Sequence, residues 1–180
     1  STKPWEQIET CTVYANKHWS VRADKVRRPD GSISEYDVID SPDAVNVVAM
    51  TKTQEVYVIG QFRYTTGVFS WEIPGGSTDG EEPLQAAKRE LQEETGLQAD
   101  QWKFLGKYQT ANGSLNEHTH IYLATGLTQT SKNEQAEEGI TQMKTVALNE
   151  ILKMIRNGEI THAQTIVSIT KAALELGLIA

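Results

Sequence analysis

The sequence predicts an α/β or α+β sandwich, in which short strands surround one central helix and two further helices cover the strands. Three observations support this class. Strand-like runs separated by turn signals fill most of the 180 residues. A segment in the middle of the chain, residues 81–95, has helical spacing and clear end signals, and residues 150–157 and 161–176 repeat that spacing near the end.

Residues 1–42 are expected to form a small antiparallel β-sheet, called the annex below, in front of a domain of residues 43–180. Three strands are predicted in the annex, at 10–14, 19–26 and 33–39, with a turn at Pro29-Asp30-Gly31-Ser32 between the last two. The polar stretch Asp40-Ser41-Pro42-Asp43 marks the boundary.

Six strands are predicted in the domain, three before the central helix in the sequence and three after it. They are 45–50, 56–62 and 69–73 before it, and 102–109, 119–124 and 140–148 after it. The helix begins after the turn Asp79-Gly80, and Pro83 suits its first turn because proline has no N–H to leave unpaired there. Gly96 is expected to end it as a C-cap.

Composition restricts the function classes. The formal charge of −7 and the pI of about 5.1 disfavour nonspecific binding to nucleic acid, which needs broad basic surfaces. No apolar run has the length that a bilayer requires and no signal peptide is evident, so no membrane partner and a cytoplasmic location are expected. The single cysteine, Cys11, rules out an internal disulfide framework.

Three glutamates carry the strongest chemical signal. Glu90 and Glu94 are four residues apart and Glu93 is three from Glu90, so the three carboxylates share one side of a helix. Leu84 and Leu91 lie on the neighbouring face, which would dock on a core. A solvated acidic face is the usual explanation of such a run. The glycine-rich segment that leads into this helix favours a metal site instead, and hard oxygen ligands suit Mg²⁺, with Mn²⁺ as a substitute.

The whole segment resembles the signature of the Nudix hydrolases. It reads Gly75, five residues, Glu81, seven residues, Arg89-Glu90-Leu91, one residue, Glu93-Glu94, one residue, Gly96-Leu97. The resemblance implies an α/β/α sandwich with a mixed central sheet.

The same resemblance implies a role for each position of the motif. Glu90 and Glu94 would be the principal metal ligands, and Glu93 a further ligand or a catalytic helper. A backbone carbonyl of Pro74 or Gly75 would complete the ligand set. Arg89 would take part in catalysis by orienting the carboxylates.

Outside the motif, the chain resembles ADP-ribose pyrophosphatases and related nucleotide-sugar hydrolases. The annex, Gln61-Phe62-Arg63, the segment Trp71-Glu72-Ile73-Pro74-Gly75-Gly76 and the ending Gly158-Glu159-Ile160-Thr161-His162-Ala163 carry this likeness. Members of that subgroup commonly pair or swap the annex between subunits, so a homodimer is expected.

Four residues are expected to bind substrate. Arg63 would hold the diphosphate, because a guanidinium binds two phosphate oxygens at once; an ordinary surface arginine is the alternative. Glu72 is assigned to the same site. Trp19 and, less directly, Trp5 would stack on the base, while packing within a dimer is equally consistent with their position.

The loop 131–139 is expected to supply the general base. Among its glutamates, Glu138 is preferred because it lies closest to the following strand, Glu137 comes second, and Glu134 is the third candidate. An acidic surface loop is the alternative. His118 and His120 alternate along a strand, where a structural role is preferred to proton transfer.

Together these features predict a Mg²⁺-dependent hydrolase. It would cleave the diphosphate of a nucleoside diphosphate sugar into a nucleoside monophosphate and a sugar phosphate. The loop 110–117 has no proline, unlike the usual ADP-ribose specialists, so GDP-mannose or a similar compound is a candidate beside ADP-ribose. The alternatives are an enzyme that cleanses nucleoside triphosphates and a sensor domain that binds nucleotide sugars without cleaving them.

Overall fold

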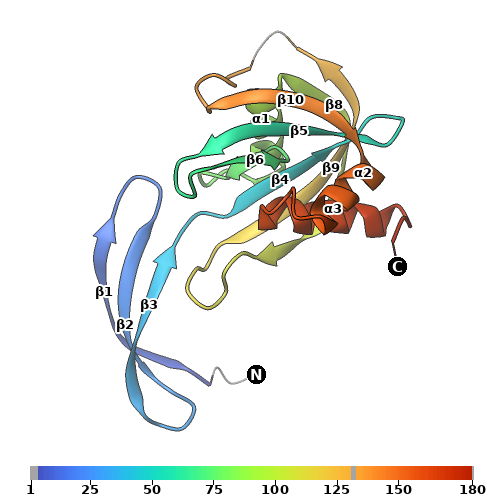
Figure 1. Ribbon diagram of the computed structural model, residues 1–180. Helices are drawn as coiled ribbons and strands as arrows, with labels where there is room; N and C mark the ends of the chain where they lie inside the picture. Colours follow the sequence, from blue (N-terminus) through green and yellow to red (C-terminus); the bar gives the residue numbers. More distant parts are fainter. Residues whose placement is uncertain (1–3, 131–132, 180) are drawn as a thin grey trace.

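The computed structural model describes residues 4–130 and 133–179, and Figure 1 shows the annex standing beside a larger body. The annex contains β1 (Glu6–Ala15), β2 (Ser20–Arg27) and β3 (Ile33–Asp40). The body contains β4 (Ala44–Ala49), β5 (Glu55–Arg63), β6 (Val68–Glu72), β7 (Gly75–Ser77), α1 (Pro83–Thr95), β8 (Leu97–Gln109), β9 (His118–Gln129), β10 (Ile140–Ala147), α2 (Leu148–Arg156) and α3 (Ala163–Glu175).

A mixed four-stranded sheet forms the centre of the body, in the order β7-β4-β9-β8. Strand β4 runs parallel to β9, whereas the β4–β7 and β8–β9 pairs are antiparallel. Both faces of β4 are buried because its side chains alternate: Val45 and Val47 pack with α1, and Val48 packs on the other side with α3. The predicted α/β/α sandwich with a mixed central sheet is therefore confirmed.

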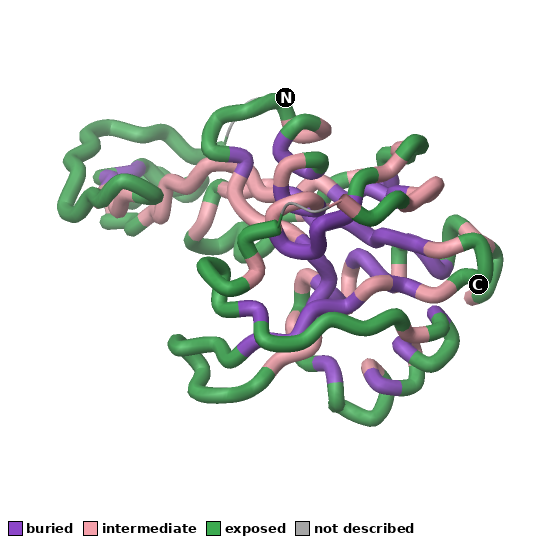
Figure 2. Tube along the Cα trace, turned by 90° about the horizontal axis from the view of Figure 1, so that it is seen from above, coloured by how far each residue is buried: buried purple, intermediate pink, exposed green. Residues whose placement is uncertain are grey.

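A second, antiparallel sheet, β10-β5-β6, lies beside the mixed sheet, and α2 and α3 close the larger core. Ile151 of α2 and Ile169 of α3 are fully buried in that core. Figure 2 shows the buried segments concentrated in the body, while the annex is mostly exposed. Among the described residues, no helix is long and apolar enough to cross a bilayer.

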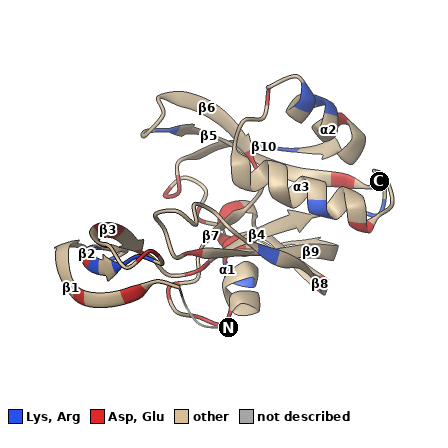
Figure 3. Ribbon diagram, turned by 90° about the horizontal axis from the view of Figure 1, so that it is seen from below, with Lys and Arg blue, Asp and Glu red and all other residues tan. Residues whose placement is uncertain are grey.

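The annex is the predicted antiparallel sheet, in the order β1-β2-β3, and every residue of β1 is exposed. Charges of both signs line it (Figure 3), including the ion pair between Glu6 and Arg27. The loop 111–116 attaches it to the body: Ile39 N–H donates to Ser114 O at 2.7 Å, and Tyr36 Oη donates to Gly113 O at 2.7 Å. These long-range bonds hold the annex at the body by its third strand.

Several element boundaries differ from the prediction. β8 begins at Leu97 and β9 continues to Gln129, because the two strands pair over a longer hairpin whose added residues are mostly polar. The short strand β7 was not predicted, since glycine has little strand preference. Helix α3 starts at Ala163, two residues later than the periodicity suggested.

Candidate active site

Helix α1 forms where the end signals placed it. The Glu82 side chain caps it by accepting from the Leu84 N–H at 2.9 Å, and Pro83 is its first residue. Gly96 ends it with φ of 71°, a left-handed conformation that favours glycine. Leu91, with Ala86 and Ala87, is fully buried against the mixed sheet. This packing fixes the face of α1 that carries the glutamates.

Glu90 and Glu94 are both buried, unlike side chains on a solvated helix face. They are 9% and 5% exposed, respectively. The Gly75 N–H donates to Glu94 Oε2 at 2.7 Å, so the first residue of β7 touches the helix directly. A Cβ at Gly76 would lie 2.6 Å from Glu90 Oε1, so any other residue there would displace the Glu90 carboxylate. The two glycines thus allow a backbone strand to approach buried carboxylates.

Arg89 joins the helix to the same turn. Its Nη1 donates to Glu90 Oε1 at 2.7 Å and to Glu93 Oε2 at 2.9 Å. Its Nε donates to Glu81 Oε1 at 3.0 Å, and its Nη2 donates to Ser77 O at 2.9 Å. Although burial opposes the charged form, the charge of Glu90 and the hydrogen bond to Glu93 raise the pKa of Arg89. One guanidinium therefore holds three carboxylates and a loop carbonyl.

The two buried carboxylates have displaced pKa values. Burial raises the pKa of Glu90 to about 6, against the opposing charge of Arg89. Burial also raises the pKa of Glu94 to about 8, with smaller contributions in the same direction from Glu90 and Glu138, while the Gly75 N–H opposes the shift. A nearby cation would stabilise the ionised form of both carboxylates and so take the place of their protons.

The backbone at the start of β7 offers one carbonyl that points away from β4. Pro74 O accepts from the Val47 N–H at 2.8 Å, in register with the pairs Asn46–Gly75 and Val45–Gly76. Carbonyls of successive residues in a strand point in opposite directions. The Gly75 carbonyl therefore points away from β4, and the Pro74 carbonyl is already bonded.

The acidic side chains are engaged with protein partners rather than gathered around one point. Within residues 4–130 and 133–179, no three His, Cys, Asp or Glu side chains converge into a ready metal cage. Glu90 and Glu93 instead face Arg89, and Glu94 faces the Gly75 N–H. Their carboxylate oxygens are nevertheless the donor type that Mg²⁺ and Mn²⁺ bind.

Arg63 and Glu72 form a second charged group, on β5 and β6. Arg63 donates to both oxygens of Glu72, from Nε at 2.9 Å and from Nη2. His162 Nδ1 lies 3.5 Å from Glu72 Oε2, and the Glu72 side chain is only 2% exposed. Burial would raise the pKa of Glu72, but the hydrogen bonds from Arg63 and the charge of His162 hold it below its ordinary value. Glu72 thus positions Arg63 rather than standing free in the site.

Part of the loop 131–139 lies against the C-terminal end of α1. The Glu134 N–H donates to Glu93 O at 2.7 Å, and Gln135 Nε2 donates to Glu94 O at 2.9 Å. Glu137 and Glu138 are exposed, and only Glu138 contributes to the pKa shifts of both buried carboxylates. Ser131 and Lys132 of this predicted loop lie outside the described residues.

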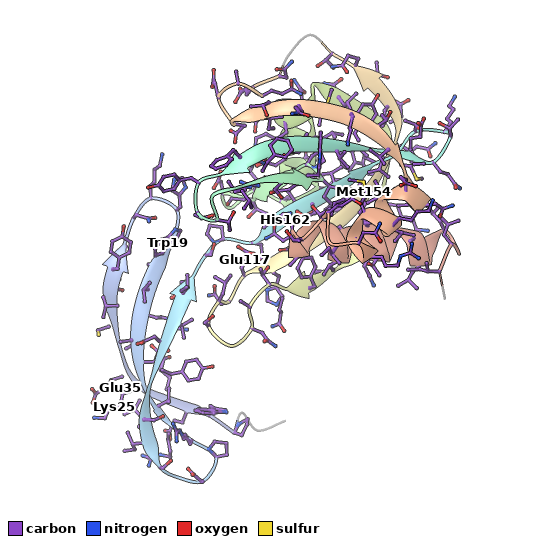
Figure 4. All side chains as sticks on the ribbon, viewed as in Figure 1. Trp19, Lys25, Glu35, Glu117, Met154 and His162 are labelled. Atoms are coloured by element: carbon purple, nitrogen blue, oxygen red, sulfur yellow. The ribbon has the colours of Figure 1, made fainter. Side chains whose placement is uncertain are left out.

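The two predicted stacking residues are far apart. Trp5 precedes β1 and Trp19 follows it, so a strand of ten residues, about 30 Å long, separates them. Trp5 packs edge-on against Tyr36 with ring centroids 5.8 Å apart, and Trp19 contacts Tyr14 at 5.2 Å. Figure 4 shows Trp19 at one end of the annex, with Lys25 and Glu35 toward the other. One base cannot contact both residues of the same chain.

Sequence reasoning missed two residues near these groups. Asp43 binds both histidines of β9: its Oδ2 lies 2.8 Å from His120 Nε2, and its Oδ1 accepts from the His118 N–H at 3.1 Å. This pairing supports the structural interpretation of the two histidines. His162 was quoted only within a motif, because a histidine before a helix has no distinctive spacing. Its proximity to Glu72 depends on tertiary packing alone.

Comparison with known proteins agrees with this architecture. Residues 40–167 match the NUDIX domain, and residues 5–39 match the nucleoside diphosphate sugar hydrolase N-terminal domain. An ADP-ribose pyrophosphatase of Mycobacterium tuberculosis (strain ATCC 25618 / H37Rv) is 35% identical over 92% of this chain and 81% of its own length. A methanol dehydrogenase activator of Bacillus methanolicus is 30% identical over 95% of this chain and 94% of its own.

The fold also has a solved counterpart. The crystal structure of an ADP compounds hydrolase superposes with a TM-score of 0.86, covering 98% of this chain and 96% of that chain at 20% sequence identity. At that identity the likeness shows the fold. Together with the family match over residues 40–167 and the relatives above, it leads to one conclusion. The chain belongs to the Nudix family, as a hydrolase similar to the ADP-ribose pyrophosphatases.

Proposed function

We propose that this protein hydrolyses the diphosphate of a nucleoside diphosphate sugar, with ADP-ribose as the first candidate substrate and GDP-mannose as the second. The products are a nucleoside monophosphate and a sugar phosphate. The observation that carries the proposal is the buried pair Glu90 and Glu94 against the Gly75-Gly76 turn. Buried carboxylates with raised pKa values at a backbone turn suit a cation that binds phosphate.

Mg²⁺ is the proposed cofactor, with Mn²⁺ as a substitute. Glu90 and Glu94 would hold it, Glu93 would assist, and the Gly75 carbonyl is the favoured backbone ligand because it points away from β4. A bound divalent cation neutralises phosphate charge and lowers the pKa of bound water. Arg89 keeps Glu90 and Glu93 on one side of the helix in the absence of substrate.

Arg63 is the proposed phosphate-binding residue. Glu72 holds its Nε and Nη2, which leaves Nη1 and the opposite edge of the guanidinium for an anion. The charges of Glu94 and Glu138 act on Arg63, so it lies near the carboxylates of α1. A diphosphate between Arg63 and α1 would meet positive charge on both sides once the cation is bound.

Glu138 is the proposed general base that takes a proton from the attacking water. Its charge influences Glu90, Glu94 and Arg63, whereas Glu137 is not among the causes of those shifts. An exposed carboxylate at the edge of a buried pair is well placed to exchange protons with solvent. Glu137 remains the second candidate.

The annex of residues 1–42 is proposed as the dimerisation unit, joined to a catalytic domain of residues 43–180. Its exposed apolar side chains support a homodimer, because Val13, Tyr14 and Ile33 are all more than half exposed. Trp19 and Trp5 are proposed base-stacking residues, and their separation means that each would serve a different site. A cytoplasmic location stays a prediction, which cell fractionation tests.

A panel of nucleotide sugars, assayed for product with Mg²⁺ and with a chelator, tests the proposed function. Glu94→Ala should lower kcat at least about a hundredfold while the circular dichroism spectrum is retained. Glu150→Ala is the matched control, because Glu150 is an exposed helical glutamate paired with Lys153. Unchanged turnover in Glu94→Ala would contradict the metal assignment. Binding without any product would favour a sensor domain, and preference for triphosphates would favour nucleotide cleansing.

A further inference from the structure

A cavity of about 440 Å³ lies between the β5–β6 hairpin and the start of α3. Side chains from both segments line it, including Arg63, Thr65, Thr66, Ser70, His162 and Gln164. Figure 4 shows His162 at the beginning of α3, on the side of the body that faces the annex. The motif on α1 contributes no residue to this lining, so the cavity is a separate feature of the site.

The lining chemistry matches a phosphorylated sugar better than a base. Hydroxyl, amide, imidazole and guanidinium groups surround the cavity, together with the Glu72 carboxylate that is paired with Arg63, and no Phe, Tyr or Trp is among its described lining residues. Sugar hydroxyls are bound by such polar groups, whereas a planar base needs an aromatic face to stack on. We propose that this cavity binds the sugar-phosphate half of the substrate and that His162 contacts the sugar. The inference rests on the proposed function, which it makes more specific.

Arg63 supplies the phosphate end of this subsite. Because Glu72 occupies one edge of the guanidinium, the remaining donors are held in a fixed direction. Gly75 follows Glu72 by three residues, which span at most about 10 Å. Gly75 in turn touches Glu94. The distance from the cavity to the carboxylates of α1 is therefore about the length of one sugar phosphate.

The ring of His162 is held by its neighbours. Its Nδ1 lies 3.0 Å from Thr165 Oγ1, and Thr165 Oγ1 also accepts from the Ile73 N–H at 3.1 Å. Thr165 is fully buried, so this arrangement is rigid. With Nδ1 engaged, Nε2 is the ring nitrogen left for a ligand. His162 thus presents one fixed polar atom to whatever fills the cavity.

Equilibrium binding of the two product types separates this subsite from the base site. We would titrate the full chain in Mg²⁺ with ribose 5-phosphate and, separately, with AMP, using isothermal titration calorimetry. His162→Gln should weaken ribose 5-phosphate about fivefold, the loss expected for one hydrogen bond to a neutral sugar hydroxyl. AMP should bind within twofold of wild type. In turnover, the same variant should raise KM for the nucleotide sugar more than it lowers kcat.

Gln164→Ala gives a second measurement in a variant that retains the fold. The Gln164 carbonyl accepts from Asn46 Nδ2, and alanine keeps that backbone bond. This variant should also weaken ribose 5-phosphate, by about threefold for a neutral hydrogen bond. His118→Gln, outside the cavity, is the matched histidine control and should change neither titration.

The outcomes distinguish the subsite from the reaction. The subsite is refuted if wild type binds no sugar phosphate. It is also refuted if His162→Gln leaves the affinity for ribose 5-phosphate unchanged, or lowers the affinity for AMP by the same factor. If sugar phosphate binding depends on His162 but no nucleotide sugar is hydrolysed, the subsite stands and the proposed reaction falls.

Discussion

Replacing Glu94 by glutamine removes one buried titratable carboxyl group while keeping the side-chain size and an acceptor for the Gly75 N–H. Burial raises the pKa of Glu94 from 4.5 to about 8. Between these two values the unfolded chain releases the proton that the folded chain retains, so metal-free wild type loses stability as pH rises. The loss is absent below pH 4.5, approaches about 1.4 kcal/mol per pH unit within the interval, and totals about 5 kcal/mol above pH 8.

Thermal unfolding in a chelator at pH 5, 6, 7 and 8 measures this loss. One kcal/mol shifts Tm by about 2–4 °C in a chain of this size, and about 3.5 kcal/mol of the loss falls between pH 5 and pH 8. The Tm of wild type should therefore fall roughly 7–14 °C further than that of Glu94→Gln over this range. Mg²⁺ should restore most of the difference at pH 8 in wild type alone, because the cation binds the ionised carboxylate.

Comparing the two proteins cancels the contribution of the titrating groups that do not interact with Glu94. Glu150→Gln, an exposed glutamate in α2, should follow the wild-type curve. If wild type and Glu94→Gln give parallel Tm curves from pH 5 to 8 in chelator, Glu94 is not a protonated buried carboxyl and the electrostatic account of the site is wrong.

Three further predictions address the base, the turn and the core. Glu138→Gln should lower kcat about a hundredfold in steady-state assays, whereas Glu137→Gln should stay within twofold; equal effects would contradict the choice of base. Gly76→Ala should weaken Mg²⁺ binding at least about tenfold by calorimetry, because its Cβ would lie 2.6 Å from Glu90 Oε1. Leu91→Ala should reduce the free energy of unfolding in urea by about 2–5 kcal/mol, since Leu91 is fully buried; a loss below 1 kcal/mol would exclude it from the core.

The local part of the site could be predicted from the sequence because its geometry is local. Glu90 and Glu94 are neighbours through helix spacing alone, and Gly96 carries the signal that ends the helix. The depth of the two carboxylates could not be predicted in this way. It depends on β7, a three-residue strand of glycines and serine that pairs with β4 from another part of the chain.

The second half of the site shows where sequence reasoning stops. Arg63, Glu72 and His162 come from β5, β6 and the start of α3, and only the packing of α3 on the core brings His162 to Glu72. The loop 110–117 was noted for its missing proline, yet in the structure its residues 111–116 hold the annex through Tyr36 and Ile39. Such contacts join residues about eighty positions apart, and no periodic pattern encodes them.

The four contacts of Arg89 have a consequence for ligand exchange. A cation that draws Glu90 or Glu93 away removes some of its bonds, but those to Ser77 and Glu81 can persist and keep the side chain in place. The helix and β7 therefore stay linked through Arg89 while one bound cation is exchanged for another. A lysine, with one ammonium group, cannot span the helix and the turn together, so at this position arginine links the shape of the turn to what the carboxylates hold.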